Sequence, residues 1–486
     1  MVSVFPTTTP NIARSDDSIA TSFQICMNTN INVRYVIFLA ATAALGGLLF
    51  GFDIAIITGA GPFLTEHFNL NDLSLGWAFS SLLFGCAFGS TVAGRLTDFY
   101  GRKKILLIVA ALFAITSLGT GVAPTFAFFI AARFIGGVAV GGASILSPLY
   151  VAEVSPPSLR GRMGTLYQMS IVTGILVSYA INYLLHDVGP ANWRWMFITG
   201  VIPSVLFFAM LLLVPETPRY LFMAGKEQQS TAILERIGGR KNAEFEVSEI
   251  RASLLNKRKA WRDLLRSDTR RAVLVGFFLA ILVQVSGVNT IIDYAPAILK
   301  SAGWKIDAAL FSTVIIGLTN FVFTFFSFFA IDRYGRKPLY IIGSLGMTGS
   351  LVVLMWVVLT GRFQSVVVLV YILVYLAFFA SCIGPVFWTL VAEIFPNSLR
   401  GTAMVVPVLT QWIANAAVVL FFPLAFNQVG KAITFGFLAS LALAQAVFTW
   451  FFVPETKNKP LEEIEQYWER TAASNLIVRA GRHASL

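Results

Sequence analysis

A single carboxylic acid interrupts a long apolar run near the start of the chain. The run LLFGFDIAIITG covers residues 48–59, and Asp53 is its one charged residue. An ionised carboxylate inside a bilayer costs a few kcal/mol, so it usually faces a cavity and has a partner. We expect that partner to be Arg133, which opens the stretch RFIGG. Such a pair either ties two helices together or binds and releases a proton.

Other charged residues belong to three motifs that appear twice along the chain. GRLTDFYGRKK resembles FFAIDRYGRKP, VAEVSPPSLRG resembles VAEIFPNSLRG, and VPETPRYL resembles VPETKNKPL. The matching acids of these motifs are 234, 240 and 239 residues apart. Because nearly one offset fits all three motifs, the sequence predicts two similar halves.

The repeated aspartate ends a predicted helix and precedes a tight Gly turn with basic residues. In the first half we expect Asp98 to meet Arg102, or the positive N-terminus of a neighbouring helix. We expect Glu153 to meet Arg160, and the second-half copies to pair in the same way, as clamps between helix ends. Charge that only sets membrane orientation explains the adjacent lysines but not the repeated spacing of aspartate and arginine. The candidate gate residues are Asp98, Arg102, Glu153, Arg160, Glu216, Arg219, Asp332, Arg336, Glu393, Arg400 and Glu455.

The composition of the chain is typical of a membrane protein. Of its 486 residues, 56% are hydrophobic and 13% are charged. A membrane-spanning helix needs about 20 apolar residues, and long apolar runs without alternating polarity favour helices over a barrel. We therefore predict an all-α integral membrane fold. The predicted spans are 34–59, 74–95, 104–122, 126–149, 163–185, 194–214, 272–300, 308–331, 338–359, 366–391, 402–425 and 430–453.

Basic residues are concentrated in alternate loops of this predicted fold. The loops after even-numbered helices hold most of the arginines and lysines, whereas the intervening loops hold few. By the positive-inside rule, the rich loops and both ends of the chain are cytosolic. The net charge of +11 therefore indicates orientation in the cell membrane, and not nucleic-acid binding.

The repeat and the charge pattern divide the chain into five segments. With six helices between the copies, both halves cross the membrane in the same sense, which leaves a cleft between them. The connection between the halves carries charges of both signs and is expected to form short cytosolic helices. The predicted segments are a cytosolic tail 1–33, a six-helix half 34–215, a linker 216–271, a second six-helix half 272–453 and a cytosolic tail 454–486.

Cysteine and histidine give no sign of a metal centre or of a reaction. The three cysteines lack metal or disulfide spacing and are expected to be packing residues. The three histidines fall in predicted loops or in a tail, with no nucleophile around them. We therefore expect neither an enzyme nor a bound metal or cofactor.

From Tyr35 to Glu463, the sequence resembles the sugar porter family of the major facilitator superfamily. This family includes bacterial xylose and galactose proton symporters and the mammalian glucose facilitators. Each motif alone is weak evidence, but all of them in order are strong evidence. The matching motifs are GGLLFGFD, two copies of D-x-x-GRK, RFIGG, two copies of AE-x(6)-RG, PETPR, Q-x-SG-x-N, GPVFW and PETK.

The resemblance implies a sugar site between the two halves. A sugar is neutral and rich in hydroxyls, so its site needs amides, which donate and accept hydrogen bonds, and an aromatic surface. Amides that only bond neighbouring helices together are the alternative interpretation. The positions that match sugar-binding or cavity-lining residues of the family are Phe50, Gln168, Gln284, Asn289, Tyr294, Asn320, Trp388, Gln411, Trp412 and Asn415.

Three positions depart from the family pattern. Paired glutamines are common in the seventh helix, but here Val283 replaces the first of them. The paired tyrosines later in that helix appear as Asp293 and Tyr294, which places a second acid at or near the cavity. Ile175 stands where some relatives have a second amide. Asp293 is expected either to bind a proton or to accept sugar hydroxyls.

The resemblance also gives Asp53 a role. In the similar symporters this aspartate and the arginine at Arg133 form the proton-coupling pair, whereas the mammalian facilitators have a neutral residue at the aspartate position. With Arg133 adjacent the carboxylate stays charged, and when the pair separates desolvation increases its proton affinity. A purely structural ion pair remains the alternative.

We therefore expect proton-coupled symport of a neutral monosaccharide or a related polyol by alternating access, with the proton as the coupling ion. The expected partners are the sugar, the proton and the lipid bilayer, and the resemblance implies a functional monomer. One rival function is a passive uniporter, and another is a membrane sugar sensor. Sensors of this fold often carry long cytosolic tails, whereas 33 residues follow Val453 here. A multidrug antiporter would share the gate motifs but not the amides and tryptophans.

Overall fold

The computed structural model describes residues 31–255, 267–395, 400–457, 459, 463–464 and 467–468. Over these residues the chain forms helices and the connections between them, and no strand. Twelve helical segments are long and apolar enough to cross a membrane. The all-α fold predicted from the sequence is confirmed.

The first half contains six of these segments, and the sixth consists of two helices. A two-helix linker follows them. The helices of the first half are α2 (Val33–Phe68), α3 (Asp72–Tyr100), α4 (Arg102–Gly121), α5 (Phe126–Val154), α6 (Pro157–Leu185), α7 (Asn192–Ile198) and α8 (Val201–Leu213), and the linker helices are α9 (Pro218–Met223) and α10 (Glu227–Leu255).

The second half repeats this order with more interruptions. Its helices are α11 (Ser267–Val285), α12 (Val288–Asp293), α13 (Ala295–Ser301), α14 (Ile306–Tyr334), α15 (Arg336–Leu359), α16 (Ser365–Cys382), α17 (Gly384–Ile394), α18 (Arg400–Ala403), α19 (Val405–Leu424), the π-helix η3 (Ala425–Val429) and α20 (Lys431–Phe452).

Two predicted spans of the second half are broken near their centres. The span 272–300 becomes α11, α12 and α13, with Gly287 at φ +89° between the first two. The span 366–391 becomes α16 and α17, which meet at Ile383. Broken helices are tolerated within a membrane where the backbone is buried in protein or lines a cavity. These breaks therefore mark the interior where a site would lie.

Helices within a half approach closely where glycines face their neighbours. A methyl group on Gly137 of α5 would lie 1.9 Å from the carbonyl oxygen of Leu82 in α3. Small residues at such contacts let helix backbones pack without a hydrophobic driving force. The second glycine of RFIGG is thus a packing residue that fixes α5, and with it Arg133, against α3.

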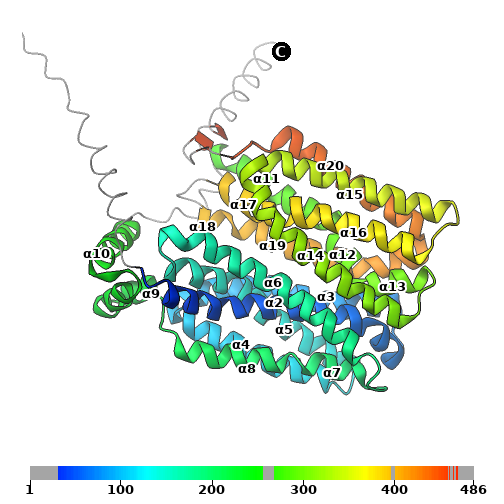
Figure 1. Ribbon diagram of the computed structural model, residues 1–486, viewed down its shortest axis with the longest axis horizontal. Helices are drawn as coiled ribbons and strands as arrows, with labels where there is room; N and C mark the ends of the chain where they lie inside the picture. The colour runs from blue at the N-terminus through cyan, green and yellow to red at the C-terminus, as the bar shows by residue number, and fades with distance from the viewer. Residues whose placement is uncertain are drawn as a thin grey trace, which may run out of the picture.

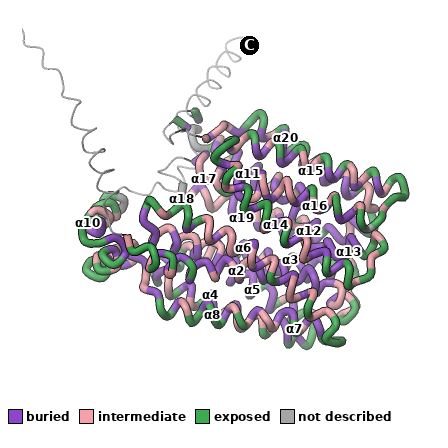
Figure 2. The backbone as a smooth tube through the Cα atoms, viewed as in Figure 1, coloured by how far each residue is buried: buried purple, intermediate pink, exposed green. Residues whose placement is uncertain are grey.

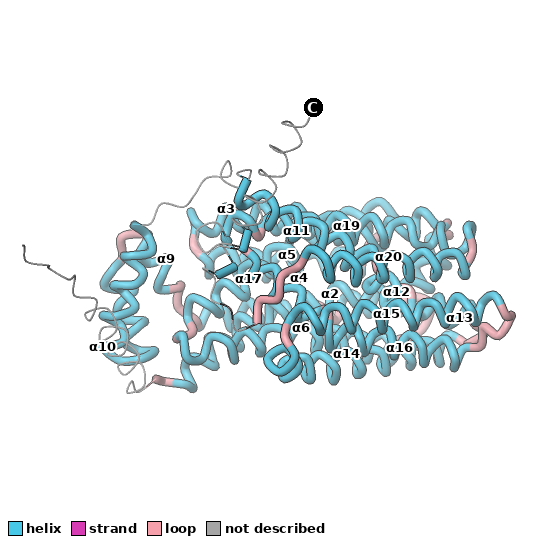
Figure 3. The backbone as a smooth tube through the Cα atoms, turned by 90° about the horizontal axis from the view of Figure 1, so that it is seen from above, coloured by secondary structure: helices cyan, strands magenta, loops and turns pink. Residues whose placement is uncertain are grey.

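The helices lie side by side in two groups, with α2 to α8 in one and α11 to α20 in the other (Figure 1). Helices α9 and α10 lie beyond one end of the bundle, as Figure 3 also shows from above. We call this end the linker end, and the end that carries the connections 69–71 and 302–305 the opposite end.

The outer surface of the bundle is rich in apolar side chains. Large exposed examples include Ile202, Leu213, Phe329, Trp450 and Phe451. Buried residues instead gather where helices face one another (Figure 2). This arrangement suits a protein whose surroundings are lipid and not water.

The linker docks on the first half. Tyr220 Oη of α9 donates to the carbonyl oxygen of Phe99 at 3.0 Å. The guanidinium of Arg236 in α10 lies 4.5 Å from the ring centre of Tyr35. The linker helices predicted from the sequence therefore pack against the start of α2 and the end of α3.

Polar contacts join the two halves at the opposite end. Asn427 Nδ2 and Gln428 Nε2 donate to Asp72 at 2.7 and 3.3 Å. His186 Nε2 lies 3.3 Å from Asp307 Oδ1, so the end of α6 meets the start of α14. The two halves are therefore closed against each other at the opposite end.

Candidate functional site

The two charged residues expected to pair inside the bilayer lie together. Asp53 on α2 is 8% exposed and Arg133 on α5 is 2% exposed. Arg133 Nη1 donates to Asp53 Oδ1 at 2.8 Å and to the Asp53 carbonyl oxygen at 3.0 Å. The ring of Phe197 lies 5.4 Å from the guanidinium. The pair is therefore buried within the first half, between helices of that half.

Two of the predicted amides bond to each other around the break in the seventh span. Asn289 Nδ2 donates to Gln284 Oε1 at 2.8 Å, across the turn at Gly287. Gln284 is buried and Asn289 is half-buried. Each amide keeps further donors or acceptors for a ligand, because a side-chain amide offers two N–H groups and two lone pairs.

Other predicted amides lie on helices that pack together. Gln168 is half-buried on α6, which packs on α14, where Asn320 is buried. Gln411 and Asn415 lie on α19, which packs on α11 and α12. The Oε1 atom of Gln411 is buried and has no hydrogen-bond partner among the described residues. A polar atom in this state is available to a ligand hydroxyl.

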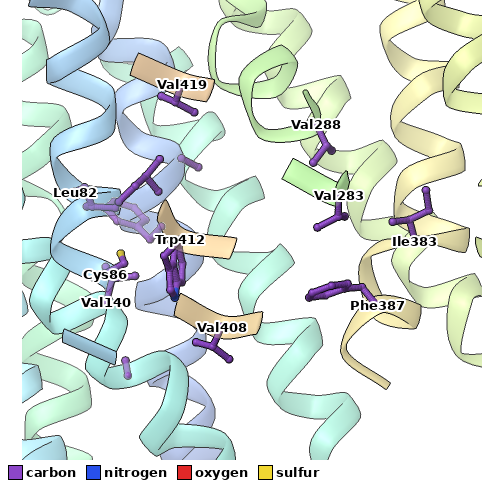
Figure 4. Close-up of a cluster of buried hydrophobic side chains, with 14 of the residues drawn as sticks. Leu82, Cys86, Val140, Val283, Val288, Ile383, Phe387, Val408, Trp412 and Val419 are labelled. Carbon is purple, nitrogen blue, oxygen red and sulfur yellow. The ribbon is translucent and has the colours of Figure 1, made fainter. Parts of the chain in front are cut away.

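Of three predicted aromatic residues, Phe50 and Trp412 lie where the two halves meet, and Trp388 lies in the second half. Phe50 of α2 meets Trp412 of α19 edge to face, with ring centres 5.8 Å apart. Figure 4 shows Trp412 projecting from α19 on the side of Leu82 and Cys86 of the first half. Trp388 of α17 is 37% exposed. Trp412 is thus buried, whereas Trp388 is partly accessible.

Tyr294 closes the space between the halves at the opposite end. Its ring stacks on Phe79 of α3 at 4.4 Å and on Phe422 of α19 at 5.2 Å. Its hydroxyl donates to the carbonyl oxygen of Val419 at 3.1 Å. Phe79 belongs to the first half, so this stack spans the interface. The sequence carried no signal for Phe79, because an apolar residue in an apolar helix shows no preferred face.

Asp293 and Tyr294 also line a cavity of about 330 Å³. The cavity lies toward the opposite end, between α2 and α3 of the first half and α12 and α13 of the second. Asp293 is 7% exposed. The remaining lining residues are Thr58, Gly61, Pro62, Thr65, Leu75, Phe79, Ala297, Lys300 and Ser301.

At the linker end of the first half, one guanidinium joins two acids. Arg102 Nε and Nη2 donate to the two carboxylate oxygens of Glu153, each at 3.0 Å, and Nη1 lies 3.6 Å from Asp98. The backbone N–H groups of Arg102 and Lys103 donate to Glu216 at 3.0 and 3.1 Å. A bidentate pair of this kind fixes geometry strongly.

The second half repeats this arrangement. Arg336 Nε and Nη2 donate to the carboxylate of Glu393 at 3.0 and 2.8 Å. The backbone N–H groups of Arg336 and Lys337 donate to Glu455 at 3.1 and 3.0 Å. The internal repeat read from the sequence is therefore also a repeat of contacts, and each cluster lies within its own half.

The expected pairing of Glu153 with Arg160 is wrong in this structure. Arg160 lies exposed on α6 and its Nη2 is 3.5 Å from the carbonyl oxygen of Ser155, whereas Arg102 is buried beside α5 and reaches Glu153. Glu393 likewise pairs with Arg336.

Three further predicted gate residues are Arg400, Asp332 and Arg219. The expected partner of Glu393, the side chain of Arg400, lies outside the described residues. Asp332 is exposed and has no ion-pair partner within the described part of the chain, and Arg219 lies in α9. The expected meeting of Asp332 with Arg336 is therefore not seen.

Glu216 combines burial with several donors. Burial raises the pKa of Glu216 above the ordinary glutamate value, although the backbone N–H groups of Thr217, Lys103 and Arg102 oppose that rise. Its carboxylate therefore takes up a proton at a higher pH than an exposed glutamate does.

Within the described residues, no group of three or more His, Cys, Asp or Glu side chains could hold a metal ion.

Two parallel halves, broken helices at mid-span and a buried ion pair define an integral membrane carrier of the major facilitator type. A family model described as "Sugar (and other) transporter" matches residues 39–468. The chain therefore belongs to this sugar transporter family, as the motifs predict.

Three comparisons with individual proteins agree. The chain is 37% identical to the D-xylose-proton symporter of Escherichia coli, over 91% of this chain and 98% of that protein. It is 37% identical to the arabinose-proton symporter of Bacillus subtilis, over 90% of this chain and 96% of that protein. The inward-open structure of the xylose transporter XylE from E. coli matches with a TM-score of 0.79 and 34% identity, covering 89% of this chain and all of that one.

Proposed function

We propose that this protein carries a neutral monosaccharide or a related polyol into the cell together with a proton, by alternating access. The observation that carries the proposal is the buried Asp53–Arg133 pair, whose atoms lie 2.8 Å apart inside a membrane-spanning half. Relatives named for proton symport of D-xylose and arabinose support it. Asp53 is the acid that takes up and releases the proton.

Coupling follows from the electrostatics of one carboxylate. While Arg133 is adjacent, Asp53 stays ionised, and separation of the pair leaves a desolvated carboxylate that binds a proton readily. The protonated and sugar-loaded carrier passes its occluded state, whereas a deprotonated loaded carrier would strand a charge in the interior. One charge crossing about 100 mV supplies about 2.3 kcal/mol, against about 1.4 kcal/mol per tenfold gradient, which sustains roughly forty-fold accumulation.

The sugar binds between the halves, where helices α11, α12 and α19 carry predicted amides and α19 also carries Trp412. The unpartnered Oε1 of Gln411 and the Gln284–Asn289 pair at 2.8 Å supply hydrogen-bonding groups, and Trp412 supplies an apolar face. Buried polar groups reject an analogue that lacks the matching hydroxyl. The same set accounts for selection of a sugar over an apolar solute.

We infer that the linker end faces the cytosol and that the protein works as a monomer in the cell membrane. The arginine-rich motifs D-x-x-GRK lie at this end, as the positive-inside rule requires of cytosolic loops. The contacts Asp72–Asn427 and His186–Asp307 close the opposite, external end. These contacts must then break when the carrier opens outward.

The decisive variant is Asp53→Asn. We expect it to lose uphill uptake but to keep counterflow, because an amide imitates the protonated acid. Labelled D-xylose, arabinose, D-glucose and myo-inositol are tested in liposomes with an imposed proton gradient and, separately, in exchange without a gradient. Asp187→Asn, at an exposed acid, is the matched control and retains both activities. Uphill accumulation by Asp53→Asn would remove Asp53 from the mechanism.

A further inference from the structure

The described membrane-spanning interior holds two buried acids and one buried arginine away from the linker end. Asp53, Asp293 and Arg133 are 8%, 7% and 2% exposed. Arg102 is also buried, but it belongs to the cluster at the linker end and is bound to Glu153. With Asp53 ionised, the three interior groups sum to one negative charge. With Asp53 protonated, they sum to zero.

Asp293 has no partner of its own in this structure. Its carboxylate makes no hydrogen bond or ion pair with any described residue, although Asp293 lines the cavity at the opposite end. The charged or titratable groups that face it are Arg133 on α5, Tyr179 on α6, the neighbouring Tyr294 and Lys300 on α13. Arg133 is the buried cation among them, and Lys300 is exposed.

Protonation of Asp53 leaves the buried Arg133 without its counter-ion, and Asp293 can replace it. A guanidinium does not lose its proton in a protein, so Arg133 stays charged after Asp53 is neutralised. Removing one partner of a buried ion pair is strongly destabilising because it leaves an uncompensated charge. Asp293 belongs to the second half and shares the lining of the cavity with Thr58 of α2, which lies about one and a half turns along that helix from Asp53. The electrostatic interaction between Asp293 and Arg133 agrees with this placement. Asp293 therefore compensates the guanidinium across the interface between the halves.

We propose that Asp293 is the second counter-ion of Arg133, and that it makes the proton-loaded carrier the electrically neutral one. This inference rests on the proposed proton coupling. When Asp53 is protonated, Asp293 attracts Arg133 toward the second half. Proton binding in the first half therefore affects the contact between the halves.

The cavity argues against direct sugar binding as the role of Asp293. Among the predicted sugar-binding residues, its described lining includes Asp293 and Tyr294 but none of the amides. The cavity that Asp293 lines thus lies apart from the predicted amides. Contact between Asp293 and the sugar is a separate outcome that the following experiment distinguishes.

The test is the pH dependence of sugar counterflow in liposomes with equal pH on both sides. D-xylose, arabinose, D-glucose and myo-inositol are the probes, and the variants are Asp293→Asn, Asp293→Glu and Asp53→Asn with Asp293→Asn. Thr290→Ser, one turn earlier on α12, is an uncharged control. Thermal unfolding of each purified variant reports whether it folds.

The sign of the expected shift follows from charge. A negative Asp293 favours the protonated form of Asp53, so its removal lowers the pH at which counterflow is half-maximal by about one unit. Asp293→Glu and Thr290→Ser keep the wild-type midpoint. The double variant is independent of pH, because Asn at position 53 cannot titrate.

Two results would overturn the inference while leaving proton symport intact. One is an unchanged midpoint in Asp293→Asn with weaker sugar affinity at every pH, which would make Asp293 a sugar ligand. The other is an unchanged midpoint with unchanged affinity. If Asp293→Asn does not fold, a shifted midpoint in Asp293→Glu, which keeps the charge, overturns the inference. Wild-type counterflow that ignores pH, together with sugar entry without proton movement, would contradict the proposed function as well.

Discussion

At the scale of single residues, two amides of the seventh span satisfy part of each other's hydrogen-bonding capacity before a sugar binds. Gln284 and Asn289 share a hydrogen bond of 2.8 Å across the Gly287 turn. A sugar can bond to the N–H groups and lone pairs that this bond leaves free, so the Gln284–Asn289 bond can stay in place. This bond reduces the cost of an unpaired buried amide in the empty site.

Gln284→Leu tests this pair. We expect the KM for sugar to rise about tenfold or more, because the variant removes one sugar contact and leaves the Asn289 amide without its partner. Transport kinetics at saturating proton concentration measure the change. Ser286→Ala, which removes only a bond to the carbonyl oxygen of Val283, serves as the control. A KM unchanged in Gln284→Leu would place this amide outside the sugar site.

At this scale, the sequence predicts a contact well where leaving a residue unpaired would be energetically costly. A buried carboxylate in an apolar helix needs a cation, and Arg133 was the obvious candidate for Asp53. The partner of Glu153 was mispredicted because Arg160 is near in sequence, whereas Arg102 is near only after α4 and α5 pack. The repeat does not separate the two candidates, because Arg102, Arg160 and Glu153 all recur in the second half, as Arg336, Arg400 and Glu393.

At the scale of elements, the tight turn before α4 fixes the charged cluster of the first half. Gly101 has φ +95°, and a methyl group there would lie 2.3 Å from Glu216 Oε2. The turn therefore needs a residue without a side chain, both for its backbone and for the approach of the carboxylate. Gly335 repeats the positive φ, at +91°, beside Glu455.

Gly101→Ala is expected to lower stability by about 1–2 kcal/mol from the positive φ alone, with a further loss from displacement of Glu216. Thermal unfolding in detergent measures the loss. Gly94→Ala on α3, where nothing lies within 4 Å of the added methyl group, is the matched control and is expected to be neutral or stabilising. Equal melting temperatures for the two variants would contradict the role of the turn.

Hydropathy predicted the number of spans but not their interruptions. The stretch QVSGVNTIID around Gly287 holds a glycine and several polar residues, but hydropathy averaged over about 20 residues still predicts one unbroken span there. The first span ends in the structure at Phe68, well beyond the predicted residue 59, because the helix continues to the left-handed Asn69 after the apolar run has ended. Backbone geometry, and not polarity, sets such boundaries.

At the scale of the whole molecule, closure at the opposite end depends on close backbone contact between the halves. A methyl group on Gly76 of α3 would lie 2.0 Å from the carbonyl oxygen of Leu420 in α19. The polar contacts of Asp72 with Asn427 and Gln428 lie at the same end. The two halves therefore meet here with little room for larger side chains.

Gly76→Leu is expected to hold the opposite end open. Transport then falls severalfold, and a cysteine introduced at Thr65, which lines the cavity at that end, reacts faster with a thiol reagent added from outside. Gly349→Leu, at a position with nothing within 4 Å, controls for the larger side chain. Unchanged transport and labelling in Gly76→Leu would show that closure does not depend on this contact.

We expect sugar entry to carry a proton that is bound at Asp53. The most direct measurement is the pH of lightly buffered medium around liposomes containing the wild-type protein when D-xylose, arabinose, D-glucose or myo-inositol is added. We expect external alkalinisation with sugar entry and, under an imposed potential of about 100 mV, accumulation approaching roughly forty-fold. Sugar that equilibrates without a pH change and without accumulation would contradict it.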